Sequence, residues 1–383
     1  MRVLFTSLRN TSHFLPLVPF IEGCQHRGHE VGVAAPVDLA DRVAQTGATF
    51  FPFGHPGDAG LAPLWARMRD APREEAKRIA IAELFAGACA GTALPGLIET
   101  VERWRPSILV RESQEYAALV AAEKAGVPSA RVGITGRHSE AELFAIAAAP
   151  LDVHRRSVGL SPDPEGARLA REAVLTMFPR SLDTELAGAP PALRFRAPRA
   201  KAPPLPDWWP GLSGPFVYAT LGTVTGGMDA MRDAFRVLIA ALVELPARVL
   251  LTVGRDLPLE TLGTPPARVH VERFVAQDEV LPHAAAIICH GGSGTVLGAL
   301  AAGVPLVVAP MFADQPFNAE RVAAVGAGLA LPFRDATAEE LRGAALRVLE
   351  EPSFRLGAQR IAAEIAALPP MEEAGAELER MLE

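Results

Sequence analysis

A glycine-rich turn between two apolar segments contains the residues of this sequence that are best suited to bind an anion. Residues 286–289 (AIIC) have the composition of a buried strand, and they are followed by His290, by GGSGT and by a helical segment. Glycine lets backbone amides approach a ligand closely, and the free N–H groups at a helix start favour a phosphate. The hydroxyls of Ser293 and Thr295 add donors. The turn predicts a phosphate site, although a plain turn whose hydroxyl caps the helix fits the same residues.

A second polar pair follows the next predicted strand. After VPLVVA at 304–309 come Asp314 and Gln315, within PMFADQPFN. In open α/β sheets ligands collect at the carboxyl ends of the strands. A carboxylate acceptor beside an amide that both donates and accepts is suited to sugar hydroxyls. The alternative is that Asp314 caps the helix beginning near Pro316.

Two further loops are expected at the same sheet edge. Phe274 and Gln277 follow an apolar strand, and an aromatic ring there could stack on a base, although a single Phe is more often a core residue. Gly222 and Thr223 end the run PFVYATLGT, where a backbone amide could meet another phosphate. Four loops at one edge, each suited to part of a nucleotide sugar, favour one composite ligand.

In the first half of the chain, a histidine and two acids are candidates for proton transfer. His13 follows the apolar run RVLFTS at the start of the first helix, and an imidazole near neutral pH can accept a proton from a hydroxyl. Glu112 ends the apolar run ILVRE, and Glu115 is a nearby competitor. The residues alone favour a structural or exposed His13, and Glu112 could equally be exposed or paired with Arg111.

Alternating strand and helix patterns in both halves predict an α/β fold. Near-continuous apolar strands between helices are typical of a parallel sheet covered on both faces. Because 383 residues exceed one usual core, we expect two domains. Prolines between Arg196 and Pro215 predict a linker, which gives a first domain at 1–205, a linker at 206–213 and a second domain at 214–383. Residues 370–383 are predicted to form a terminal helix.

Composition narrows the class of protein. The net charge of −7 argues against a general nucleic-acid or anionic-membrane partner, and 49% hydrophobic with 21% charged residues describes a globular chain. The start of the chain is unlike a signal peptide, and no apolar run reaches membrane-spanning length. Three cysteines far apart predict buried free thiols, so we expect a cytoplasmic protein. Two acid-x-acid pairs, Asp163 with Glu165 and Asp183 with Glu185, are interpreted as turn or surface acids rather than metal ligands.

The stretch from about Arg268 to Leu331 resembles the donor-binding motif of family 1 glycosyltransferases. It contains VERFVAQDEVLPHAAAIICHGGSGTVLGALAAGVPLVVAPMFADQPFNAERVAAVGAG and, within that family, is similar to bacterial enzymes that glycosylate natural products such as macrolides and enediynes. The likeness is thinner in RVLFTS…H…PLVPF…GHEV and VYATLGT. It implies the GT-B fold: two Rossmann-like, doubly wound domains facing a central cleft. The first would bind the acceptor and the second the nucleotide-sugar donor, with the last helix crossing back onto the first.

The resemblance also implies roles for individual residues of the second domain. His290 matches the histidine at the donor's α-phosphate, and Asp314 and Gln315 match the pair that holds the donor sugar. Phe274 stands where the family usually has Trp, and Ala276 replaces a usual Pro, so dTDP- and UDP-sugars both stay open. The implied donor-binding residues are Thr223, Phe274, Val275, Gln277, His290, Gly292, Ser293, Gly294, Thr295, Asp314 and Gln315.

The implied reaction is an inverting transfer of the donor sugar to a hydroxyl of a lipophilic natural product, as in antibiotic biosynthesis. His13 would be the general base and Glu112 its orienting carboxylate, with no essential metal and no cofactor. Apart from the resemblance, Trp65, Phe85 and Phe144 lie in Ala-rich helical stretches, where such residues are more often core, but together they could line an apolar acceptor cleft. The interpretation allows for a homodimer and includes no integral membrane association. The alternative is a non-catalytic GT-B auxiliary protein that activates a partner glycosyltransferase; a nucleotide-sugar epimerase fits the local motif less well.

Overall fold

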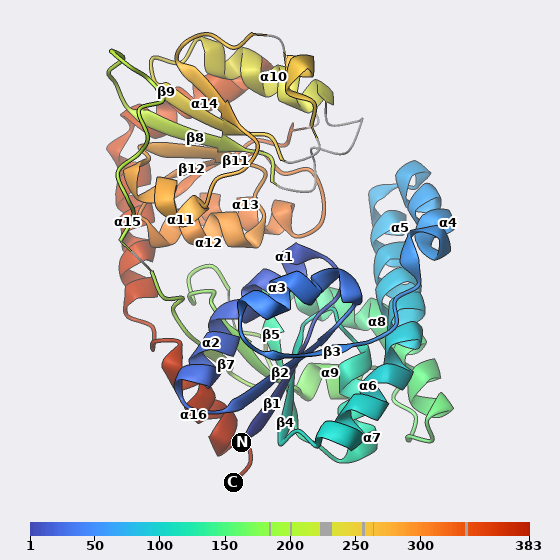
Figure 1. Cartoon of the computed structure of the whole chain (residues 1–383). Helices are drawn as coiled ribbons and strands as arrows, with labels where there is room; N and C mark the ends of the chain where they lie inside the picture. The colour runs from blue at the N-terminus through green and yellow to red at the C-terminus, as the bar shows by residue number, and fades with distance from the viewer. Residues whose placement is uncertain (184, 200, 223–231, 255–256, 263, 334–335) are drawn as a thin grey trace. The chain divides into compact units, whose positions relative to one another are not determined.

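Alternation of apolar strands and helices produces a parallel sheet in each half of the chain (Figure 1). The computed structural model describes residues 1–383 except 184, 200, 223–231, 255–256, 263 and 334–335. The chain divides into two compact units. The first comprises Met1–Pro198 with Leu368–Glu383, and the second comprises Arg199–Ala367. Each unit is built as the α/β pattern of the sequence predicts.

The first unit contains, among its described residues, a sheet of seven parallel strands in the order β3-β2-β1-β4-β5-β6-β7. Strand β1 is central and pairs with β4, with Phe5 opposite Val110 and Thr6 opposite Arg111. The loops that follow β1 and β4 therefore leave the sheet next to each other. The strands are β1 (Arg2–Thr6), β2 (Glu30–Ala35), β3 (Thr49–Pro52), β4 (Ile108–Glu112), β5 (Ser129–Gly133), β6 (Ala173–Thr176) and β7 (Ala192–Arg194).

Both faces of this sheet are covered by helices, which explains why its strands are apolar on both sides. Val3 and Phe5 of β1 pack into one core cluster with α2 and α16. Leu4 points the other way, into a cluster with α6, α7 and α8. The helices are α1 (Thr11–Phe14), α2 (Val18–His26), α3 (Ala40–Gln45), α4 (Gly57–Asp70), α5 (Arg73–Arg78), α6 (Ala90–Trp104), α7 (Ala117–Ala125), α8 (Arg137–Ser157), α9 (Ala167–Arg171) and α16 (Glu372–Arg380), with 3₁₀ turns η1 (Leu15–Leu17) and η2 (Val37–Leu39).

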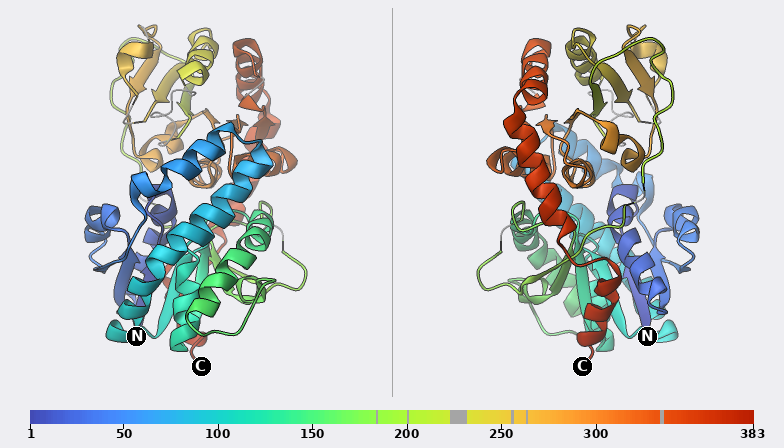
Figure 2. Two further views of the ribbon diagram at one scale, coloured as in Figure 1. Left: turned by 90° about the vertical axis from the view of Figure 1, so that its right-hand side faces the viewer. Right: turned by 90° about the vertical axis from the view of Figure 1, so that its left-hand side faces the viewer.

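A continuous helical rod, Arg73–Trp104, joins α5 to α6 through a π-helical stretch, η3 (Ile79–Cys89), and the left view of Figure 2 shows its course. By length and composition alone it is apolar enough to cross a membrane, although Glu83 interrupts its apolar run. In the structure the rod packs against α4, α7 and α8. It thus contributes core contacts to the first unit, and the cytoplasmic location stays a prediction.

The second unit contains, in the part that the structure describes, six parallel strands in the order β10-β9-β8-β11-β12-β13. Glycine ends helices in both units where the sequence repeats Ala-Gly-Val-Pro: Gly126 has φ 67° and Gly303 has φ 68°. The elements are β8 (Phe216–Thr220), β9 (Arg248–Thr252), β10 (Val269–Glu272), β11 (Ala286–Cys289), β12 (Leu306–Val308), β13 (Gly328–Ala330), α10 (Arg232–Val243), α11 (Gln277–Val280), α12 (Ser293–Ala301), α13 (Gln315–Ala324), α14 (Ala338–Glu350) and α15 (Pro352–Ala366), with 3₁₀ turns η6 (Leu259–Leu262) and η7 (Leu281–His283).

The segment predicted as a linker, 206–213, is grouped with the second unit, and the division falls between Pro198 and Arg199. Aromatic packing explains the difference. Trp208 stacks on His270 of β10 with ring centroids 5.1 Å apart, and Trp209 is buried against Phe216 of β8. The prolines exclude regular structure as expected, but the two tryptophans hold the segment on the second sheet.

The last segment, Leu368–Glu383, belongs to the first unit, where α16 lies along α2 (Figure 1). Arg27 at the end of α2 pairs with Glu379 of α16, with Nη2 and Oε2 2.6 Å apart. Gly23 of α2 permits the close approach, because a Cβ there would lie 2.7 Å from the carbonyl oxygen of Met371. A small residue in α2 thus decides how closely the chain end packs.

Replacing Gly23 by Ala is expected to loosen this packing. The new methyl group overlaps the backbone of Met371, and overpacking of this kind costs about 1–3 kcal/mol in the free energy of unfolding. The control is Gly343→Ala in α14, where a Cβ meets nothing within 4 Å and alanine stabilises the helix by about 1 kcal/mol. Chemical denaturation measures both, and hydrogen exchange of 368–383 should rise only in Gly23→Ala. Unchanged exchange there would show that α16 does not depend on this contact.

Candidate functional site

The first unit brings His13 and Glu112 together although they lie 99 positions apart in the sequence. His13 is in α1, directly after β1, and Glu112 is the last residue of the neighbouring strand β4. Nδ1 of His13 is 3.0 Å from Oε1 of Glu112, whose side chain is fully buried. A carboxylate can only accept, so this contact places the ring proton on Nδ1 and leaves Nε2 able to accept one. The geometry suits a general base with an orienting carboxylate.

Glu115, the competing carboxylate, is used differently. Its carboxylate accepts hydrogen bonds from the Thr6 hydroxyl and from the backbone amides of Ala117 and Ala118 at the start of α7, at 2.8, 3.0 and 3.1 Å. Burial raises the pKa of Glu115 to about 7. Of the two acids, the structure therefore brings Glu112 to His13, while Glu115 satisfies amides at a helix start.

An apolar surface adjoins His13. Phe85 of η3 lies edge-on to the imidazole, with ring centroids 5.7 Å apart and planes at 64°. Phe85 packs against a small cluster separate from the main cores, and the cluster consists of Leu8, Leu61, Leu84 and Cys89, with Leu64 and Ala88 beside it. A π-helix is rare and often marks a functional site, and here it carries Phe85 next to the histidine.

The other two aromatic residues expected at the acceptor differ in their surroundings. Trp65 of α4 is 44% exposed. Phe144 of α8 is buried in the core, where its ring centroid lies 4.8 Å from Cζ of Arg131 and 5.8 Å from Cζ of Arg111. Since its ring already covers two guanidinium groups, Phe144 is a core residue with a cation–π role, and we do not carry it into the acceptor site.

In the second unit, glycines enclose the imidazole of His290. A Cβ on Gly292 would lie 2.6 Å from Nε2 of His290, and one on Gly222 would lie 2.8 Å from the same atom. Burial lowers the pKa of His290 to about 4, so the ring is neutral near pH 7. Its Nδ1 is buried and has no hydrogen-bond partner among the described residues. A neutral imidazole held in this way can offer one N–H to an anion at the first turn of α12.

Ser293 at the start of α12 contacts Asp314, a pairing that the sequence did not predict. The Ser293 hydroxyl donates to Oδ2 of Asp314 at 2.5 Å. Burial raises the pKa of Asp314, opposed by its hydrogen bonds from Ser293 and Asn318. Ala313 has φ 54°, a left-handed conformation that a residue with a Cβ rarely adopts, and it sits immediately before the aspartate. Backbone strain here accompanies the orientation of Asp314.

Two residues that the sequence interpretation missed complete this site. Asn318, one helical turn after Asp314, donates to the carbonyl of Gly291 at 2.8 Å and to Oδ2 of Asp314 at 2.9 Å. Its i,i+4 spacing from Asp314 was a usable signal. Tyr218 of β8 accepts from Gln277, which also donates to Thr295 at 3.2 Å. The tyrosine lay inside an apolar run, which gave no sign of its role.

The remaining residues predicted to bind the donor differ in burial and in hydrogen bonding. Gln315 accepts hydrogen bonds from the amides of Met311 and Phe312, at 2.9 and 3.1 Å, so its side-chain oxygen holds the loop. Phe274 is 55% exposed. With Val275 it lines a hollow of about 420 Å³ beside the proline-rich segment. Gly294, in the first turn of α12, has open space around its Cβ position. Thr223 lies outside the described residues.

The acid-x-acid pairs differ from each other. Asp163 accepts from the amides of Ala167 and Arg168 and so caps α9, in agreement with a turn acid. Asp183 ends a turn that begins at Pro179, in agreement with a turn acid, but it is buried and pairs with Arg194 at 3.0 Å, so it is not a surface acid. Among the described residues, no group of three or more His, Cys, Asp or Glu side chains is arranged to hold a metal ion.

Similarity to known proteins covers the whole chain. Residues 236–381 match the family described as erythromycin biosynthesis protein CIII-like, C-terminal domain. The chain is 34% identical over 379 residues to L-demethylnoviosyl transferase of Streptomyces niveus, covering 96% of this chain and 95% of that protein. It is 30% identical over 417 residues to 4'-demethylrebeccamycin synthase of Lentzea aerocolonigenes, covering 96% of each.

Solved structures of glycosyltransferases resemble this chain along its whole length. The glycosyltransferase SnogD from Streptomyces nogalater aligns with a TM-score of 0.79 at 28% identity, covering 100% of this chain and 99% of that one. The glycosyltransferase VinC in complex with DTDP aligns with a TM-score of 0.78 at 28% identity over the same shares. With two parallel-sheet units and this likeness along its length, the chain belongs to the GT-B glycosyltransferases of bacterial natural-product biosynthesis.

Proposed function

We propose that the protein moves a sugar from a nucleotide diphosphate sugar, with dTDP or UDP as the nucleotide, to a hydroxyl group of a lipophilic natural product. The contact between His13 and the buried Glu112 is the observation that carries this proposal. The first unit binds the acceptor and removes its proton, and the second unit binds the donor. VinC was solved with DTDP, which supports a thymidine nucleotide as the first to test.

His13 is the proposed general base. Its Nε2 takes the proton of the acceptor hydroxyl while the oxygen attacks the anomeric carbon and the bond to the diphosphate breaks. Glu112 keeps the ring oriented and stabilises the imidazolium that forms, as the carboxylate of a catalytic triad does. Because the incoming oxygen displaces the diphosphate directly, the configuration at the anomeric carbon inverts.

The leaving diphosphate gains negative charge, and the first turn of α12 is suited to stabilise it. Backbone amides of Ser293, Gly294 and Thr295 begin a helix whose dipole is positive at that end. His290 adds a neutral donor. Preorganised donors of this kind act where charge develops, so the proposed mechanism includes no metal ion. Asp314 and Gln315 are proposed to bind the sugar hydroxyls, and Phe274 the base.

The proposed acceptor is apolar because of what adjoins His13. Phe85 contacts the imidazole, and Leu61 and Leu64 of α4 belong to the same small cluster. Trp65 follows on α4 with an exposed indole. Apolar side chains beside a proton-accepting group favour a hydrophobic molecule that presents a hydroxyl. The relatives compared above are named as transferase and synthase, which does not favour the non-catalytic auxiliary protein.

The first test is an assay of the purified protein with dTDP- and UDP-sugars and a panel of hydroxylated polyketide and aromatic aglycones. We expect release of nucleotide diphosphate together with a glycoside of inverted anomeric configuration. Retention of configuration would contradict the direct displacement. Stabilisation by nucleotide diphosphates without turnover of any acceptor would favour a binding protein instead.

Replacing His13 by Ala should lower the transfer rate by about 10²–10⁴-fold, which is the usual contribution of a general base. Thermal stabilisation by dTDP should persist, because the variant leaves the second unit intact. His26→Ala, which removes an exposed histidine of the same unit, is the control and should keep the wild-type rate. Full activity of His13→Ala would remove the proposed base.

Gly292→Ala should weaken donor binding at least about tenfold. The added methyl group occupies space 2.6 Å from Nε2 of His290, so the imidazole has to leave its position. Gly298→Ala in the same helix is the matched control, since its methyl meets only the flexible end of Leu281 at 3.2 Å. Thermal-shift titration with dTDP and UDP measures both variants, and equal affinities would argue against the role of His290.

A further inference from the structure

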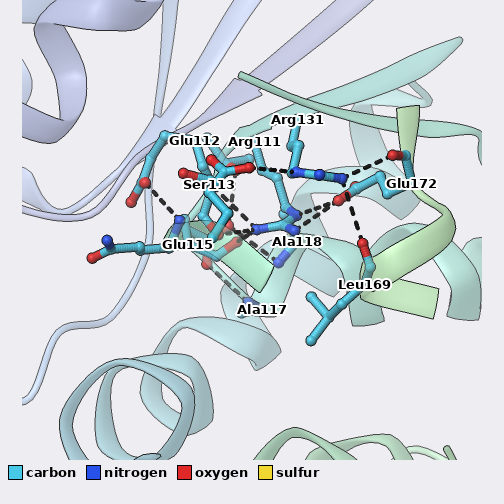
Figure 3. Close-up of polar contacts among 12 residues, drawn as sticks. Arg111, Glu112, Ser113, Glu115, Ala117, Ala118, Arg131, Leu169 and Glu172 are labelled. Atoms are coloured by element: carbon cyan, nitrogen blue, oxygen red, sulfur yellow. Dashed lines mark hydrogen bonds and ion pairs between the residues drawn. The ribbon is translucent and has the colours of Figure 1, made fainter. Parts of the chain in front are cut away.

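Arg111 of β4 is fully buried directly before Glu112, and its guanidinium lies inside the turn that follows the strand (Figure 3). Nη1 donates to the carbonyl oxygen of Ser113 at 2.7 Å and reaches those of Glu112 and Glu115 at 3.3 and 3.4 Å. One nitrogen therefore contacts three carbonyls of a single turn, residues 112–115. These carbonyls lie in the interior, where a donor is needed to satisfy them.

The other edge of the same guanidinium is fixed by Glu172. Nε donates to Oε2 of Glu172 at 2.9 Å, and Nη2 lies 2.7 Å from the same oxygen. Burial alone would lower the pKa of Arg111, but the Glu172 carboxylate outweighs it and raises that pKa, so the group stays charged. Glu172 precedes β6, two strands away from β4 in the sheet. Arg111 thus connects the turn to a rigid part of the first unit.

This turn sets the geometry of the proposed base. Oε1 of Glu112 contacts His13, and Oε2 accepts from the backbone amide of Gln114 at 2.7 Å, which lies in the turn that Arg111 holds. A shift of the turn would move the Glu112 carboxylate and the amide that orients it together. Without the guanidinium, the buried carbonyls of this turn would lose their donor, and the turn would have to rearrange to satisfy them.

We propose that Arg111 is a positioning residue for transfer: it holds the turn at 112–115 so that Glu112 stays in contact with His13. This inference rests on the proposed function of the His13–Glu112 pair. Lysine does not substitute for it. A single ammonium group cannot span the distance between Glu172 and the carbonyls of the turn, whereas the planar guanidinium presents donors on both edges.

The test is a double-mutant cycle of Arg111→Lys and Glu112→Ala in the full chain. We expect Arg111→Lys to lower kcat about tenfold or more, since a small misplacement of a catalytic group has effects of this size. The donor KM and the stabilisation by dTDP should not change. In the Glu112→Ala background, Arg111→Lys should lower kcat no further, because the carboxylate that Arg111 positions is absent.

Arg194→Lys is the matched control. Arg194 is also buried, pairs with Asp183 at 3.0 Å, and donates to the carbonyls of Phe178 and Asp183, far along the sheet on β7. We expect it to lower the melting temperature as Arg111→Lys does. Its effect on kcat should be small and equal in the presence and absence of Glu112.

Multiplicative effects of Arg111→Lys and Glu112→Ala on kcat would overturn the inference and leave the base assignment in place. A Glu112→Ala protein with the wild-type rate would instead overturn the proposed role of the pair, and Arg111 with it. If Arg111→Lys does not yield folded protein, Glu172→Gln takes its place in the same cycle. Glutamine has the size of glutamate but lacks the charge that fixes the guanidinium. The same lack of additivity with Glu112→Ala is then expected, and additivity would overturn the inference.

Discussion

The buried carboxylate of Glu112 is the constraint on which the first unit depends. An ionised carboxylate away from water is costly unless donors reach both of its oxygens. Here His13 reaches one oxygen and the amide of Gln114 the other. The parallel pairing of β1 with β4 makes this possible, because it ends the two strands at one edge. The hydrogen bond between His13 and Glu112 therefore depends on the pairing of β1 with β4, on the loop after β1 and on the turn after β4.

The two units use the same residue type in opposite ways. His13 has the carboxylate of Glu112 3.0 Å from its Nδ1, which orients the ring for its proposed role as base. His290 has no such partner among the described residues; instead, burial lowers its pKa to about 4 and keeps the ring neutral. A neutral ring can donate to a phosphate without adding a proton to it. Environment rather than residue identity thus separates the two proposed roles, a pattern seen in enzymes with paired titratable groups.

How far the sequence predicts each part depends on whether its contacts are local. The turn at His290 was predictable because its strand, glycines and helix start are contiguous, and Gly292 is small for a reason visible in the structure. The parallel sheets followed from the apolar strands. The linker at 206–213 was misplaced, since prolines indicate irregular chain but do not reveal which unit Trp208 and Trp209 pack on.

Contacts between distant residues were harder to predict. His13 and Glu112 are 99 positions apart, and the sequence left Glu115 as a nearby competitor for the same role. The choice between the acids depends on a turn that directs Glu115 back toward the amides of α7. Phe144 stayed a candidate for an acceptor contact because the sequence does not show that Arg111 and Arg131 lie against its ring. Such pairs depend on tertiary packing and leave no periodic pattern in the sequence.

This difference between local and distant contacts follows from the chemistry of each unit. The donor site proposed for the second unit relies on backbone amides, whose positions are set by glycines and a helix start within a few residues. The base proposed for the first unit relies on two side chains, His13 of α1 and Glu112 at the end of β4, and the buried carbonyls of the turn after β4 need donors. Arg111 supplies them to the turn that carries Glu112, and Glu172, 61 positions later, compensates its charge. The proposed donor site is therefore encoded largely in one short stretch of sequence, whereas the proposed base depends on charged residues that are far apart in the sequence.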